Sequence, residues 1–303
     1  MSEHVSVLLE ESVDALAIEP NGTYMDCTFG RGGHSRKILA ALGEQGRLIG
    51  FDQDPEAIRV GEALAHEDSR FSIVHSNFSD VESVISSMGL LGKVDGVLMD
   101  LGVSSPQLDQ ANRGFSFQQD GPLDMRMNTA QAQTAEQWLN HASESELADV
   151  FWRYGEERFS RKLAAAIVMD REKQPFTRTK QLADMIARVL PNSKEKKHPA
   201  TRAFQAIRIQ VNAELESLVV ALEAMPKVLA HGGRLSVISF HSLEDRLVKQ
   251  FYKPKQDPRL RGLPVQGEKV EMKAVGKPLK ASAQEVDANP RSRSAVLRVF
   301  ECQ

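Results

Sequence analysis

The sequence is short of several residue types and patterns, and each shortage excludes a class of protein. Its two cysteines, Cys27 and Cys302, supply neither a disulfide framework nor the ligand set of a zinc site. Nowhere do about 18 apolar residues follow one another, so no membrane span is predicted. The first ten residues lack the basic start and apolar core of a signal peptide. We therefore expect a cytoplasmic protein that uses no metal.

What is present is typical of an ordinary folded protein. Apolar residues make up 41% of the chain and charged residues 26%, as in water-soluble globular proteins. A chain of 303 residues can bury a large core. Its length suits one or two domains.

The net charge of −3 is distributed unevenly along the chain. Residues 246–298 hold 13 Lys and Arg against 5 Asp and Glu, a net charge of +8, so the rest of the chain carries −11. A basic segment on an acidic chain is typical of a surface that binds a polyanion. A solvated charged loop would explain the same residues, and both interpretations stay open.

The residues from Thr23 to Ser35 have the pattern of a strand, a tight turn and the start of a helix. A short apolar run reaches Asp26, a glycine cluster follows, and Ile38 and Leu39 begin a helical spacing. This arrangement places the N–H groups of a helix N-terminus beside the turn, where glycines let a ligand approach the backbone. The rest of the chain is organised around this stretch.

A second short strand, 47–52, ends at Asp52, which lies 22 residues after Gly30. In nucleotide-binding βαβ units an acid at this distance hydrogen-bonds a ribose. The pattern therefore favours a nucleoside site. Glycines that only make the turn, with Asp52 as a solvated strand end, would produce the same residues.

The charge of the turn indicates which nucleoside binds there. A dinucleotide brings a pyrophosphate, and Asp26 would stand close to it, at a cost of several kcal/mol for two like charges about 4 Å apart. Ser35 also occupies the position of the third glycine in a dinucleotide fingerprint. S-adenosylmethionine (SAM) carries a sulfonium and an ammonium but no phosphate. An acid-rimmed site tolerates both cations, so SAM is the better ligand.

Two further predicted strands, 71–74 and 94–101, carry candidate site residues at their carboxyl ends, where open α/β sheets bind ligands. Phe78 follows the first and could stack on adenine or belong to the core. Asp100 ends the second. It could accept a hydrogen bond from a flipped base, hold the SAM ammonium, or be a solvated strand end.

Local caps mark two of the helix starts. Asp54 has the position of an N-cap, with Pro55 as the first helical residue. Ser242 and Asp245 form the capping pair of a helix that follows a turn and strand over 231–240.

The alternation of strands and helices is interrupted in the middle of the chain. An irregular stretch follows residue 102, and helical patterns then extend to His198. We expect a discontinuous domain of residues 1–110 and 201–303, with 111–200 inserted as a loop and a helical substrate-recognition domain.

After the insertion the α/β pattern resumes. The apolar spacing predicts one long helix over 201–225, and the last strand, 294–301, is expected at an edge of the sheet. The fold class is therefore α/β, with a mostly parallel Rossmann-like sheet and an inserted all-α domain.

Long motifs along almost the whole chain resemble the bacterial MraW/RsmH family of class I SAM-dependent methyltransferases. The motifs are His4-Val-Ser-Val-Leu-Leu, Asp26-Cys-Thr-Phe-Gly-Arg-Gly-Gly-His-Ser35, Phe51-Asp-Gln-Asp54, Met99-Asp-Leu-Gly-Val-Ser-Ser-Pro-Gln107, Arg113-Gly-Phe-Ser-Phe117, Arg208-Ile-Gln-Val-Asn-Ala-Glu-Leu215, Ile238-Ser-Phe-His-Ser-Leu-Glu-Asp-Arg246 and Asn289-Pro-Arg-Ser-Arg-Ser294.

The resemblance implies transfer of a methyl group from SAM to the exocyclic N4 of a cytosine in small-subunit (16S) ribosomal RNA, by direct in-line attack. The RNA partner would be the small subunit or its precursor, and a homodimer is left open. Asp100 is the candidate catalytic residue. The SAM contacts implied by the resemblance are Gly32, Gly33 and His34 near the methionine part, Asp52 at the ribose, Phe78 at the adenine, and Asp100 and Gln107.

Two positions depart from common patterns. Thr28 stands where class I enzymes in general have their first glycine, and Ser6 replaces a proline of the family's first motif. Two rival functions also remain: a nicotinamide oxidoreductase on the same fold, and a ribosome-assembly factor that keeps SAM only as a structural ligand. Asp26 and Ser35 speak against the first.

Overall fold

The computed structural model describes residues 6–190, 198–253 and 271–303. The chain forms two compact units. One, the sheet unit, combines Met1–Gly102 with Glu216–Gln303, and the other, the helical unit, is Val103–Leu215. Each unit is described by itself.

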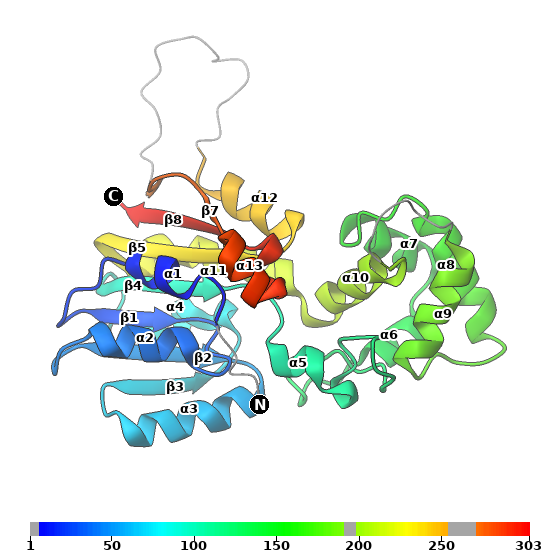
Figure 1. The fold of residues 1–303 in the computed structure, drawn as a ribbon, viewed down its shortest axis with the longest axis horizontal. Coiled ribbons are helices and arrows are strands. Elements are labelled where there is room, and N and C mark those ends of the chain that lie inside the picture. Colours follow the sequence, from blue (N-terminus) through cyan, green and yellow to red (C-terminus); the bar gives the residue numbers. More distant parts are fainter. Residues whose placement is uncertain (1–5, 191–197, 254–270) are drawn as a thin grey trace, which may run out of the picture. The chain divides into compact units, whose positions relative to one another are not determined.

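The sheet unit is built on one mixed sheet with the strand order β3-β2-β1-β4-β5-β8-β6 (Figure 1). The first five of these strands run parallel, whereas β8 is antiparallel to its neighbours β5, β6 and β7. The strands are β1 (Thr23–Asp26), β2 (Arg47–Asp52), β3 (Phe71–His75), β4 (Val94–Asp100), β5 (Leu229–Ser239), β6 (Met272–Ala274), β7 (Leu279–Lys280) and β8 (Val296–Cys302).

Apolar side chains cover both faces of this sheet, as expected for parallel strands. Along β1, Tyr24 joins one core cluster and Met25 another, because successive side chains of a strand point to opposite faces. The Tyr24 cluster includes side chains from α1, α2 and α3, and the Met25 cluster those from α4, α11 and α12. These helices are α1 (Leu9–Asp14), α2 (Gly33–Ala41), α3 (Pro55–Glu67), α4 (Val81–Ser87), α11 (Glu214–Val228) and α12 (Ser242–Phe251), and the short α13 (Ala283–Ala288) precedes β8.

The expectation that the last strand lies at a sheet edge is wrong. β8 sits between β5 and β6, with Cys302 paired to Met272. The three-residue β6 lies in a basic segment that shows no strand pattern. It is held there because Met272 is 1% exposed and packs in the core with Phe300 of β8.

One predicted helix start is confirmed and the other is corrected. Asp54 caps α3 by accepting a hydrogen bond from the Glu56 N–H, with Pro55 in the first turn. At α12 the cap is His241, paired with Glu244, and not Ser242 with Asp245. Asp245 is engaged elsewhere, since it accepts two hydrogen bonds from the Arg298 guanidinium of β8, at 2.8 and 3.1 Å.

All α-helices of the helical unit except its first, five-residue helix contribute to one apolar cluster. Its boundaries differ from the predicted insertion, because residues 103–110 and 201–215 group with it. The physical reason at the second boundary is that Phe204, Ile207 and Val211 belong to the apolar cluster of this unit. Its helices are α5 (Ser105–Asp109), α6 (Ala135–His141), α7 (Glu144–Arg153), α8 (Ser160–Arg171), α9 (Thr179–Val189) and α10 (Ala200–Asn212).

The single helix predicted over 201–225 is in fact two helices, α10 and α11. Between them Ala213 has a left-handed backbone with φ of 48°, which costs a non-glycine residue energy. The Asn212 side chain holds this break: its Oδ1 accepts from the Met127 N–H and its Nδ2 donates to the Met125 carbonyl, at 2.7 and 2.8 Å. The side chains thus compensate for the strain in the backbone.

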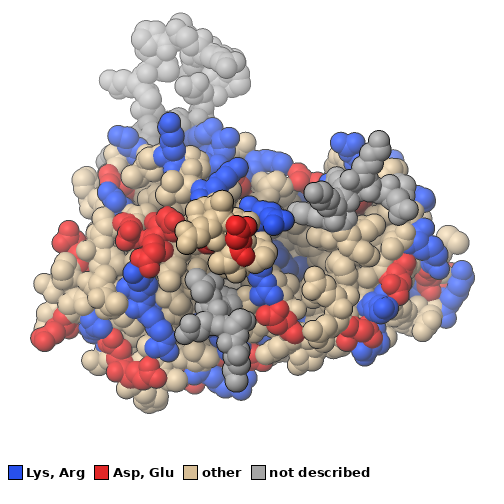
Figure 2. Space-filling model, viewed as in Figure 1, with Lys and Arg blue, Asp and Glu red and all other residues tan. Residues whose placement is uncertain are grey.

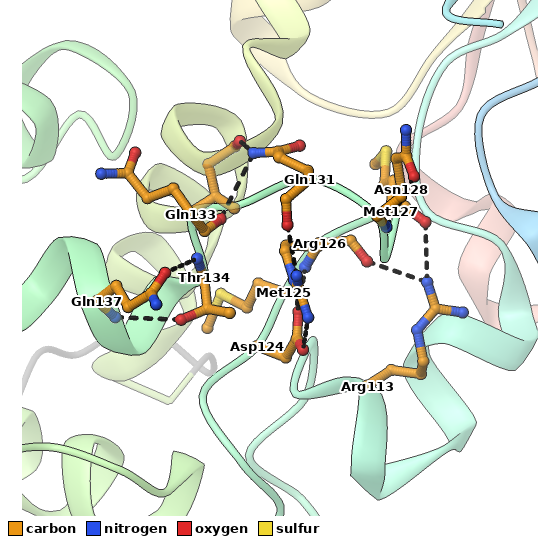
Figure 3. A network of polar contacts seen from close by, with 12 residues as sticks. Arg113, Asp124, Met125, Arg126, Met127, Asn128, Gln131, Gln133, Thr134 and Gln137 are labelled. Atoms are coloured by element: carbon orange, nitrogen blue, oxygen red, sulfur yellow. Dashed lines mark hydrogen bonds and ion pairs between the residues drawn. The ribbon is translucent and has the colours of Figure 1, made fainter.

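The irregular stretch before α6 is ordered by polar contacts of the same kind (Figure 3). Arg113 is 6% exposed, and its guanidinium donates to the carbonyls of Arg126 and Met127. Asp124 forms an ion pair with Arg126, and Gln131 Nε2 donates to the Val211 carbonyl at 2.6 Å. The loop is therefore a fixed part of the helical unit. Among the described residues, no helix combines the length and apolar character needed to cross a membrane.

We expect Asn212→Ala to destabilise the protein by about 1–3 kcal/mol, because it removes the buried hydrogen bonds of the Asn212 side chain with the Met127 N–H and the Met125 carbonyl. Urea unfolding measures the change. The matched control is Asn128→Ala, which removes one exposed hydrogen bond from the Ala130 N–H and should change the free energy of unfolding by no more than about 0.5 kcal/mol. Equal effects of the two substitutions would contradict the assigned role of Asn212.

Candidate functional site

Three carboxylates of the sheet unit lie at the carboxyl ends of adjacent strands. Asp26 ends β1, and its neighbours β2 and β4 end at Asp52 and Asp100. From β1 the chain adds β2 and β3 on one side, whereas from β4 it adds β5 on the other, so the direction of winding changes between β1 and β4. In open α/β sheets this switch point is where ligands bind.

Asp26 is the most deeply buried of the three, with no exposed surface. Its Oδ2 accepts a hydrogen bond from the Ser35 hydroxyl at 2.6 Å, and its Oδ1 accepts from the Thr28 N–H at 3.1 Å. Burial raises the pKa of this carboxyl, whereas His34 and the bonds from Ser35 and Thr28 oppose that shift. Ser35, which replaces the third glycine of a dinucleotide fingerprint, is therefore the hydrogen-bond donor to the buried Asp26.

Thr28 links this acid to the end of β4. Its hydroxyl oxygen accepts a hydrogen bond from the Asp100 N–H at 2.7 Å. Glycine, the general class I residue here, could not make this bond. The departure at Thr28 thus has a structural role that the sequence did not reveal.

Asp100 presents a carboxylate that the protein leaves partly unsatisfied. Its Oδ1 is buried and accepts no hydrogen bond from the described residues, and its Oδ2 lies 3.8 Å from His34 Nδ1. Burial raises the pKa of Asp100 to about 6; His34 opposes the shift, and Asp26 and Glu244 add to it. A buried acceptor without a partner is costly unless a ligand donates to it.

His34 is oriented by the backbone. Its Nε2 lies 3.1 Å from the Val7 carbonyl oxygen, and since a carbonyl only accepts, Nε2 carries the proton. The other ring nitrogen, Nδ1, therefore faces Asp100. The ring is 4% exposed, so its position is fixed by packing.

The glycine turn is crowded at the two positions singled out by sequence. Gly32 has φ of 77°, and a Cβ there would lie 2.8 Å from the Phe29 ring. A Cβ on Gly33 would overlap Ser6 Oγ. Only glycine suits both positions, and α2 begins at Gly33 with its first N–H groups at this turn.

The Asp52 carboxylate accepts hydrogen bonds from the glycine turn after β1 and from the loop that follows β2. One of its oxygens accepts from the Gly30 N–H at 2.8 Å and the other from the Asp54 N–H at 2.9 Å. Burial raises the pKa of Asp52 to about 6, although these two hydrogen bonds lower it. An ionised carboxylate has about four acceptor positions, so two remain for ligand hydroxyls.

The other two predicted residues lie in different surroundings. Phe78 begins a short 3-10 helix, η1 (Phe78–Asp80), after β3 and is partly buried against the core cluster of the sheet unit. Gln107 belongs to the helical unit, where its side chain accepts from the Ser104 N–H and completes the capping box of α5. The role of Gln107 as a cofactor contact stays a prediction.

Sequence reasoning missed the polar contacts beside Phe78. Asn77 caps η1 by accepting from the Ser79 N–H, and its amide donates to the Gln53 side chain at 3.2 Å. Asn at the start of a helical turn is a recognisable cap signal. Gln53, which follows Asp52 directly, gives no such signal.

An edge with three carboxylates, a glycine turn at a helix N-terminus and an unpartnered acceptor suits a cationic nucleoside better than a phosphate. Together with the mostly parallel sheet, this arrangement is the class I methyltransferase fold predicted from the sequence.

Comparison with known proteins agrees with this class. The model of the MraW methylase family matches residues 1–303. Ribosomal RNA small subunit methyltransferase H of Idiomarina loihiensis is 58% identical over 305 residues, which cover 98% of this chain and 96% of that protein. The protein of the same name from Alteromonas mediterranea is 56% identical, with coverage of 99% and 97%. The chain belongs to the MraW methylase family, and the oxidoreductase alternative is thereby discarded.

If Asp52 holds the ribose hydroxyls, Asp52→Ala should weaken SAM binding by about 1–3 kcal/mol, the scale of lost charge-assisted hydrogen bonds. Titration calorimetry measures the dissociation constant. Asp95→Ala is a matched control, because Asp95 also accepts a backbone N–H, that of Thr23, but near the opposite end of the strands. An affinity that Asp52→Ala leaves unchanged would remove Asp52 from the site.

Proposed function

We propose that this enzyme transfers the methyl group of SAM to the exocyclic N4 of a cytosine in the RNA of the small ribosomal subunit. The observation that carries the proposal is full-length similarity at 58% identity to a protein named ribosomal RNA small subunit methyltransferase H. A ribosomal substrate in a bacterial cell implies a cytoplasmic enzyme.

The residues on the sheet edge have distinct roles in this proposal. When bound, SAM supplies an electrophilic methyl group. Asp52 holds its ribose, Phe78 lies against its adenine, and the turn at Gly32, Gly33 and His34 receives its methionine part. Gln107 of the helical unit is an additional cofactor contact.

No protein nucleophile is required, because the cytosine amine can react directly. Cys27 is buried, and burial raises the pKa of its thiol far above the physiological range. Such a thiol is an inert core residue. Orientation of the two reactants would then supply most of the rate acceleration.

Asp100 is the candidate for contact with the reacting amine. The lone pair of cytosine N4 is shared with the ring, and an acceptor for one N4 hydrogen would direct that lone pair toward the methyl group. The buried, unpartnered Oδ1 of Asp100 has the properties of such an acceptor. The competing role is to hold the SAM ammonium.

RNA recognition is assigned to the helical unit and to the basic C-terminal segment. Lys249, Lys253, Lys277 and Arg298 line a cavity of about 220 Å³ in the sheet unit, and Figure 2 shows basic side chains gathered over α12. Four more Lys and Arg of this segment fall within 254–270, outside the described residues. In this proposal the excess of positive charge in residues 246–298 binds the RNA polyanion.

Transfer of tritiated methyl from SAM to small-subunit particles tests the function directly. We expect label in the small-subunit RNA and, after digestion to nucleosides, in N4-methylated cytidine. If calorimetry shows SAM binding but no label reaches the RNA or its precursor particles, the protein is an assembly factor with a structural ligand. The proposed function would then be wrong.

For Asp100 we expect Asp100→Asn to lower single-turnover methyl transfer at saturating SAM by about 10²-fold or more. Because the pKa of Asp100 is raised to about 6, the wild-type rate should fall as the pH decreases through 6 and the carboxylate is protonated. The variant should lack this dependence. Full recovery of the rate at saturating SAM would show that Asp100 only anchors the methyl donor.

A further inference from the structure

The corner between α7 and α8 in the helical unit exposes two large aromatic side chains. We define the α7–α8 corner as residues 152–162. Trp152, at the end of α7, is 59% exposed, and Phe159, just before α8, is 47% exposed. The other tryptophan, Trp138, is 2% exposed and donates its indole N–H to Glu146. Core packing therefore explains Trp138 but neither corner aromatic.

The backbone of the corner is held in place by hydrogen bonds. Glu157 is 6% exposed; its N–H donates to the Phe151 carbonyl, and its carboxylate accepts from the Phe159 N–H at 2.8 Å. A Cβ on Gly155 would lie 2.7 Å from the Phe151 carbonyl oxygen, so the chain turns tightly there. Trp152 and Phe159 thus project from a fixed frame, which lowers the entropy lost when they bind a partner.

The charges around these aromatics are mainly positive. Four exposed cations belong to the corner, and none of them forms an ion pair with a residue that the structure describes. Glu157 is buried, so the exposed acids are Glu156 within the corner and Asp149 one turn earlier in α7. The exposed cations are Arg153, Arg158, Arg161 and Lys162.

The start of α8 adds a further attraction for anions. The first N–H of this twelve-residue helix, that of Ser160, donates to the Glu157 carbonyl at 3.2 Å. The N-cap side chain makes no capping hydrogen bond, and two of the cations, Arg161 and Lys162, stand in the first turn of the helix. A helix N-terminus attracts anions such as phosphate.

We propose that the α7–α8 corner binds a single-stranded segment of RNA, with bases stacked on Trp152 and Phe159 and phosphates contacted by the surrounding cations. Exposed aromatic faces set among Arg and Lys are the combination that binds single strands with little sequence preference. The proposal rests on the proposed function, since it places part of the ribosomal RNA substrate on the helical unit. A protein partner is less suited to four unpaired cations.

The test compares substitutions that keep or remove an aromatic plane. Trp152→Leu and Phe159→Leu should each weaken the binding of a short oligoadenylate by about 5- to 150-fold, the range for one stacked base. Trp152→Phe should largely restore affinity. Met169→Ala is the matched control, because Met169 of α8 is 61% exposed and apolar but outside the corner; it should change nothing.

Two probes separate stacking from simple charge attraction. Heparin carries anionic groups but no bases, so its affinity should be the same for Trp152→Leu and the wild type. Oligoadenylate should quench the fluorescence of the exposed Trp152, while emission from the buried Trp138 reports that each variant remains folded.

The inference is overturned if Trp152→Leu and Trp152→Phe bind oligoadenylate equally, or if heparin binding falls as much as RNA binding. It is also overturned if the leucine variants bind the RNA of the small subunit as tightly as the wild type does and lose affinity only for the proteins of small-subunit particles. Normal methyl transfer by the wild type in any of these cases leaves the proposed function intact. Absence of methyl transfer by the wild type, with stacking confirmed, would contradict the proposed function alone.

Discussion

The structure of the sheet edge depends on burying the Asp26 carboxylate at the end of β1. A carboxylate without exposed surface is costly unless its oxygens are hydrogen-bonded, and here Ser35 and the Thr28 N–H satisfy one oxygen each. These bonds join the first turn of α2 to the end of β1. They therefore fix the path of the glycine turn between the two elements.

The same network extends to the candidate reacting group. Thr28 accepts from the Asp100 N–H, and His34, one residue before Ser35, faces the Asp100 carboxylate. Burial raises the pKa values of Asp26, Asp52 and Asp100, and the charge of Asp26 raises those of Asp52 and Asp100 further. A cationic ligand would relieve this repulsion, which is why an acid-rich edge suits SAM.

Features set by neighbouring residues were predictable from the sequence. The parallel strands, the cap at Asp54 and the acids at strand ends follow from periodicity and from local hydrogen bonding. The break at Ala213 was not, because the partners of Asn212 lie 85 and 87 residues away. The cap at His241 was missed for a similar reason, since Asp245 pairs with an arginine 53 residues further on. The bonds of Ser35 and Thr28 also had no local signature.

The most direct test of the account is a double-mutant cycle on single-turnover methyl transfer at saturating SAM, measured with Thr28→Val, Asp100→Asn and the combined variant. If the network from Asp26 through Thr28 positions Asp100, the two substitutions should be coupled by about 0.5–3 kcal/mol, as residues of one hydrogen-bond network are. Effects that add to within about 0.3 kcal/mol would mean that Asp100 acts independently of the buried acid. That result would contradict the account.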